Sequence, residues 1–101
     1  MSKHRFTIEQ RDIDQAIART SWGCAVALAI QRKFPKLEVD VVPVGDGHEV
    51  RTYTWPRMTD LQPVRKLVHR FRVSGNASKW ITKFDTTGSN VPATFEMTPV
   101  T

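Results

Sequence analysis

The sequence lacks the usual signatures of catalysis, disulfide bonding and metal binding. Its one cysteine, Cys24, has no partner for an internal disulfide, and the three histidines show no spacing typical of metal ligands. No Gly-x-Ser-x-Gly motif or other nucleophile signature is present. We therefore expect a protein that is not an enzyme and that carries no metal or cofactor.

Long apolar segments are also missing. The longest apolar run, Cys24 to Ile30, is far shorter than the roughly 20 residues that a membrane-spanning helix needs. The opening MSKHRFTIEQ contains cations but no apolar stretch, so we expect no secretory signal and a cytoplasmic location. Cys24 stands among apolar residues, which predicts a small buried hydrophobic residue with an unreactive thiol.

Negative charge is scarce in the second half of the chain. Residues 1–50 contain as many acidic as basic residues, so the whole net charge of +5 lies in residues 51–101. No acidic residue occurs between Asp60 and Asp85. A solvated helix face usually mixes charges of both signs, so this stretch favours an anionic partner, with a plain solubilising surface as the alternative.

The first third of the chain predicts a strand and two helices. Residues 5–10 are β-prone, and Asp12 is expected to cap a short helix that ends near Arg19. Thr20 or Ser21 would cap a second helix over residues 22–34. Because the middle of that helix is apolar on every side, we expect it to be buried at the centre of the fold.

The middle third predicts a β-hairpin. Apolar and polar residues alternate from Leu37, and the sequence VGDGH (44–48) supplies the turn before a second β-prone run, Val50 to Trp55. Tyr53 and Trp55 are expected on the face opposite Val50, where they are candidates for stacking on bases.

The last third predicts an amphipathic helix over residues 61–72, because its apolar residues recur every three or four positions. Asn76 would cap a further helix over 77–84, although WITKF (80–84) also alternates as a strand does. Residues 91–98 predict a final strand at the edge of the sheet. The 101 residues are thus expected to form one α+β domain, a small antiparallel sheet packed against the central helix and the basic helix.

Two stretches resemble small uncharacterised proteins of actinobacterial tailed phages. The first comprises Asp12-Ile13, Ala16 and the run Cys24 to Ala29. The second comprises Ile81, Phe84-Asp85, Gly88, Pro92 and Phe95-Glu96-Met97. The resemblance implies a phage origin and a small α+β fold, and it lends no catalytic residue. Many of those proteins have a second cysteine where this chain has Trp22.

The candidate binding residues lie on or beside the positive stretch: Arg65, Lys66, His69, Arg70, Arg72, Asn76, Lys79 and Lys83. Two more specific sites are open alternatives. Residues 73–79, VSGNASK, can present backbone amides to a phosphate at a helix start, although they lack the full Walker pattern. Residues 61–84 can also be arranged as a helix-turn-helix with 77–84 as the reading helix.

We therefore expect a non-enzymatic protein that binds nucleic acid, a nucleotide or a nucleic-acid-loaded host complex through a basic surface. The phage resemblance implies counter-defence as its purpose. The alternatives are an assembly protein that contacts an acidic host protein and a sequestrant of a nucleotide signal. A sheet this small leaves edges uncovered, so a homo-oligomer is also expected.

Overall fold

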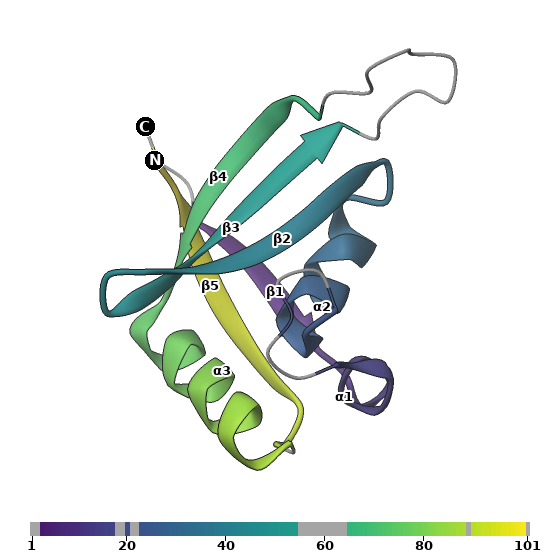
Figure 1. Cartoon of the computed structure of the whole chain (residues 1–101), viewed down its shortest axis with the longest axis vertical. Coiled ribbons are helices and arrows are strands. Elements are labelled where there is room, and N and C mark those ends of the chain that lie inside the picture. Colours follow the sequence, from purple (N-terminus) through teal and green to yellow (C-terminus); the bar gives the residue numbers. More distant parts are fainter. Residues whose placement is uncertain (1–2, 18–19, 21–22, 55–64, 89, 101) are drawn as a thin grey trace.

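The computed structural model describes residues 3–17, 20, 23–54, 65–88 and 90–100, which form an α+β fold (Figure 1). The elements in chain order are β1 (His4–Ile8), α1 (Gln10–Gln15), α2 (Ala25–Lys33), β2 (Leu37–Val44), β3 (Gly47–Thr54), β4 (Leu67–Val73), α3 (Gly75–Thr87) and β5 (Ala93–Pro99). Within these ranges no helix is long and apolar enough to cross a bilayer.

The five strands form one antiparallel sheet in the order β1-β5-β4-β3-β2. Helix α2 links β1 to β2, the two edge strands, and packs against both of them (Figure 1). The sheet therefore curls around α2, and α3 covers the part near β3 and β5. Side chains that point away from the helices lie on the open face of the sheet.

The hydrophobic core lies between α2, α3 and the concave face of the sheet. Ile8, Ile30 and Met97 come from β1, α2 and β5 and are fully buried. Burying a side chain of this size stabilises the fold by about 1.5–3 kcal/mol. The buried central helix that the apolar run predicts is thus confirmed, because α2 contributes five buried residues to this core.

Both early helices begin at residues other than those expected. Glu9, not Asp12, is the N-cap of α1, and the backbone N–H of Glu9 donates to the Asp12 carboxylate at 2.8 Å. Asp12 is buried and receives two further hydrogen bonds from Arg32. Helix α2 begins after Cys24, whose sulfur accepts a hydrogen bond from the Ala27 N–H. Thr20 accepts from the Gly23 N–H.

The predicted basic helix over residues 61–72 is wrong for the part that the structure describes. Residues 67–73 form β4, which pairs with β3 on one side and β5 on the other. Phe71 and Val73 face the core while Arg70 and Arg72 face outward, which is the alternation of a strand. Residues 61–64 lie outside the described ranges. The helix-turn-helix alternative is therefore also wrong, since the segment expected as its first helix contains strand β4.

Of the remaining expectations, some are confirmed and others are wrong. The hairpin is confirmed: β2 and β3 pair over their full length around Gly45, which has a φ of 59°. Residues 80–84 are helical, within α3, and the N-cap of that helix is Ser74 instead of Asn76. The last strand is not an edge strand, because β5 lies between β1 and β4. Pro99 is accommodated as its final residue.

Candidate basic groove beside helix α3

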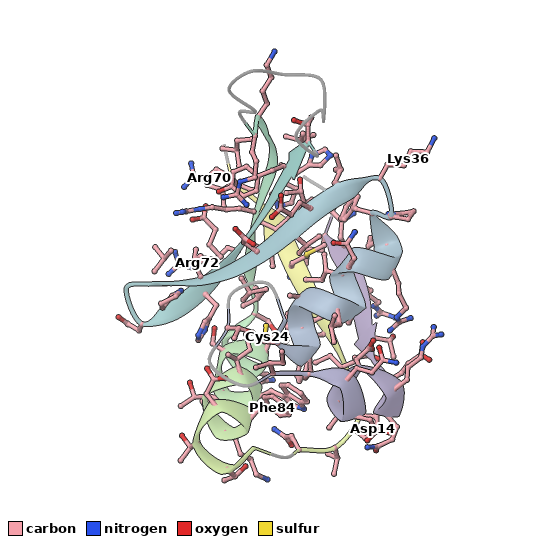
Figure 2. The ribbon with its side chains drawn as sticks, turned by 45° about the vertical axis from the view of Figure 1, so that its right-hand side comes forward. Asp14, Cys24, Lys36, Arg70, Arg72 and Phe84 are labelled. Carbon is pink, nitrogen blue, oxygen red and sulfur yellow. The ribbon has the colours of Figure 1, made fainter. Side chains whose placement is uncertain are left out.

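The eight candidate residues are divided between two elements and the chain that leads into them. Arg70 and Arg72 project from the open face of β4, on the opposite side of the molecule from Lys36 in the view of Figure 2. Arg65 and Lys66 precede β4, whereas Asn76, Lys79 and Lys83 are exposed on α3. The candidates that the sequence places on a helix over residues 61–72 therefore do not share a helix face, because residues 67–73 form a strand.

Two of the arginines are held by carboxylates from the first half of the chain. Arg65 lies 3.0 Å from Glu38 and 3.3 Å from Asp40, and its guanidinium covers the Tyr53 ring at 4.2 Å. Arg70 donates to Glu49 at 2.6 Å. These interactions leave Arg65 and Arg70 less available to an external anion.

Glu49 is the centre of the Arg70 cluster. Its side chain is only 2% exposed, and Arg51 on the same strand donates to it at 2.9 Å. Burial raises the pKa of the Glu49 carboxyl, but the hydrogen bonds from Arg70 and Arg51 outweigh this effect, so its pKa lies below the ordinary value. Arg51 and Arg70 stand directly opposite each other on neighbouring strands, and the shared carboxylate offsets their repulsion.

His69 and Lys66 have structural surroundings that the sequence did not reveal. The His69 ring lies 5.5 Å from the Phe34 ring and 5.6 Å from the Phe71 ring, so it points to the core side of the sheet, away from Arg70. The Lys66 backbone joins β3 through hydrogen bonds to Thr54. Within the described residues, no carboxylate pairs with the Lys66 side chain.

An open groove of about 560 Å³ runs along the outer face of α3. We call it the basic groove; it is lined by Asp46, Gly75, Ser78, Lys79, Thr82, Lys83, Thr86 and Thr87. Lys79 and Lys83 are exposed, and no described carboxylate forms an ion pair with either. Lys79 and Lys83, like Lys66, therefore remain available to a negatively charged ligand, and of these three only Lys79 and Lys83 line the groove.

The threonines give the groove a less polar wall than their type implies. The hydroxyls of Thr82, Thr86 and Thr87 each donate to the backbone carbonyl four residues earlier. Because the hydroxyl protons are used within the helix, the threonine methyl groups and the lysine stems supply apolar contact surface. The groove thus combines apolar walls with positive charge at Lys79 and Lys83.

Arg72 adjoins the groove through Gly47, the first residue of β3. A side-chain Cβ at Gly47 would lie 3.3 Å from the Arg72 guanidinium and 3.5 Å from the Ser78 hydroxyl. Arg72 is otherwise held by one hydrogen bond, to the carbonyl of Val44 at 3.2 Å. The absence of a side chain at Gly47 therefore lets the Arg72 guanidinium and the Ser78 side chain approach the β3 backbone closely, because even a methyl group there would crowd Arg72.

A second, smaller cavity of about 310 Å³ lies between α2, α3 and the hairpin, where Cys24, His48 and Asp85 share its wall. Burial raises the pKa of the Cys24 thiol to about 11, so the thiol is protonated near neutral pH and unreactive, as its apolar neighbours predict. The Nδ1 of His48 is buried and has no hydrogen-bond partner in the described structure. No cluster of three His, Cys, Asp or Glu side chains in the described ranges is placed to hold a metal.

Comparison with known proteins adds no identification: no family model, curated protein or solved structure matches this chain. The interpretation of the site therefore depends on its own geometry. Sequence reasoning found Lys79 and Lys83 but missed Asp46 and Gly47, because the approach of the hairpin turn to α3 leaves no local pattern. The i,i+4 spacing of Thr82 and Thr86 was a usable signal, since it places both on one helix face.

Proposed function

We propose that this chain is a non-enzymatic binding protein that holds a phosphate-bearing partner, nucleic acid in the first instance, on the basic groove and the adjoining Arg72. The observation that carries the proposal is the contrast in pairing: Lys79 and Lys83 face an open groove without a carboxylate partner among the described residues, whereas Arg65 and Arg70 are held by carboxylates. Unpaired cations that face a concave surface attract polyanions, and nucleic acid is the most highly charged of these.

The open face of the sheet supports the same proposal. Its described part presents Arg5, Arg51 and Arg72. Arg5 lies 3.8 Å from Glu96 and Arg51 is paired with Glu49, so within the described residues Arg72 is the one of these three without a carboxylate partner. A polyanion bound along α3 can therefore extend over Arg72 toward the sheet.

A role in counter-defence within an infected cell, and a cytoplasmic location, belong to the same proposal. Counter-defence is supported by the resemblance to phage proteins alone. An acidic host protein is the competing partner, and its recognition would use the same lysines.

Self-association is also proposed, on a separate observation. Leu67 and Val68 are 51% and 42% exposed, at the end of β4 that extends beyond its pairing with β5. Exposed apolar side chains on an unpaired strand edge favour pairing with a second chain. Light scattering during size-exclusion chromatography tests this, and a monomer at all concentrations would oppose it.

Fluorescence anisotropy with single- and double-stranded DNA and RNA tests the main proposal. The variant K79E/K83E should bind at least tenfold more weakly than wild type, while the matched control K33E/K36E, at the end of α2 and just beyond it, should bind normally. Equal losses in both variants would indicate a nonspecific charge effect. If neither nucleic acid nor nucleotide binds while an acidic protein does, the assembly alternative replaces the proposal.

A further inference from the structure

Ser78 is a buried hydroxyl without a hydrogen-bond partner at the inner wall of the basic groove. The residue is 7% exposed, and among the described residues its Oγ has no hydrogen-bond partner. Its neighbours on the helix satisfy their hydroxyls through carbonyls four residues earlier, but Ser78 does not. Leaving a buried hydroxyl unpaired costs about 1–3 kcal/mol, so a bound oxygen atom at this place would recover part of that cost.

The position next to Ser78 also brings donors of positive charge together. The Arg72 guanidinium and the Ser78 hydroxyl both lie close over Gly47. Lys79 follows Ser78 in sequence and lines the groove with it, and the first turn of α3 directs its positive end toward this region. A hydroxyl and an ammonium that line the groove, with a guanidinium beside it, complement a tetrahedral oxyanion.

Arg72 is lightly held, so its guanidinium can move. Its hydrogen bond to Val44 is its only side-chain hydrogen bond in the described structure. Because the guanidinium is the far end of a flexible side chain, its shift away from Gly47 makes room for an anion oxygen beside Ser78. Gly75, at the start of α3, leaves open space at its own Cβ position.

The rest of the groove limits what else the ligand contains. Its volume of about 560 Å³ is within the range of small-molecule sites, and its walls are threonine methyls and lysine stems. The Asp46 carboxylate, which also lines the groove, accepts hydrogen bonds from hydroxyl or amino groups. A ligand with one phosphate and an organic body that carries such donors fits both features.

We propose that the basic groove binds a small phosphomonoester of nucleotide size, with its phosphate between Arg72, Ser78 and Lys79 and its organic body along Thr82 and Lys83. This inference depends on the proposed function, in that both use the same groove, and it names the class of ligand.

Isothermal titration calorimetry of the full chain with a nucleoside 5′-monophosphate, the nucleoside alone, inorganic phosphate and a single-stranded oligonucleotide tests the proposal. The monophosphate should bind at least tenfold more tightly than the nucleoside. S78A should weaken monophosphate binding about fivefold to tenfold through loss of one hydrogen bond, without loss of thermal stability, because no protein hydrogen bond is removed.

G47A is the sharper variant, because its methyl group would lie 3.3 Å from the Arg72 guanidinium and 3.5 Å from the Ser78 hydroxyl, where it blocks an anion from reaching both. It should abolish detectable binding of the monophosphate, whereas the matched control G75A, whose methyl group meets open space, should bind as wild type does. Equal affinity of G47A and wild type, or of monophosphate and nucleoside, would overturn the inference. If the oligonucleotide binds and the monophosphate does not, the inference fails and the proposed function stands. If neither binds, both fail.

Discussion

The arginines next to and within β4 and the lysines of α3 belong to one positive stretch of sequence but differ in what surrounds them. Arg65 and Arg70 contact Glu38, Asp40 and Glu49, all from the hairpin. Lys79 and Lys83 face the basic groove with no paired carboxylate in the described structure. Positive charge in a sequence therefore does not indicate availability, because cross-strand neighbours decide which cations serve stability and which remain open to a partner.

The largest expected effect comes from reversing a charge on the paired side of this comparison. R70E would place a carboxylate beside the buried Glu49 and remove the hydrogen bond at 2.6 Å. We expect a loss of about 3 kcal/mol in the free energy of unfolding, near the low end for breaking a buried pair because Arg70 is partly exposed. Urea unfolding measures this change.

The matched substitution on α3, K79E, should change the free energy of unfolding by less than about 0.5 kcal/mol, as is usual for exposed surface sites. Similar losses in R70E and K79E would contradict the division between paired and unpaired cations. The same result shows why charge reversal of Arg70, unlike that of Lys79, is a poor probe of binding.

An intermediate effect is expected for the start of α3, which positions Lys79. The Ser74 side chain accepts a hydrogen bond from the Ala77 N–H, so S74A should lower the free energy of unfolding by about 1 kcal/mol. S78A removes a hydroxyl that has no protein partner and should leave stability unchanged or slightly higher. Thermal unfolding of the two variants distinguishes them, and a larger loss for S78A would refute the assignment of Ser74 as the cap.

The smallest effect concerns His48 and the pH dependence of the free energy of unfolding. Burial lowers the pKa of His48, Asp85 opposes this effect and Arg72 adds to it, so the net pKa lies below 6.5. The unfolded chain therefore takes up the proton first, and the free energy of unfolding should fall as pH drops through 6.5 and level off below the folded pKa. H48Q should remove this dependence between pH 7.5 and 5.5. An unchanged slope in H48Q would show that other groups cause it.

Much of the fold was predictable because it has local signals. The apolar run from Cys24 to Ile30 predicts a buried helix, and the alternation from Leu37 with its Gly-containing turn predicts the hairpin. The strand β4 was mistaken for a helix because its apolar residues also fit a helical spacing. Its structure is determined by long-range pairing with β3, which also brings Arg70 next to Glu49.

The candidate site was predictable in part for the same reason. Lys79 and Lys83 stand on an amphipathic segment, so their exposure follows from local pattern. The close approach of Arg72 and Ser78 to Gly47 and the unpaired hydroxyl of Ser78 depend on how the hairpin turn approaches α3. No spacing within either segment encodes that approach, because it results from tertiary packing.

The most direct test of the central claim compares one cation from each side of the division by the salt dependence of nucleic-acid binding. For double-stranded DNA, each phosphate contact contributes about 0.9 to the slope of log K against log salt. We expect K83Q to reduce this slope by about 0.9. R65Q, which removes an arginine held by Glu38 and Asp40, should leave the slope nearly unchanged. A reduced slope in R65Q together with an unchanged slope in K83Q would contradict the division between paired and unpaired cations.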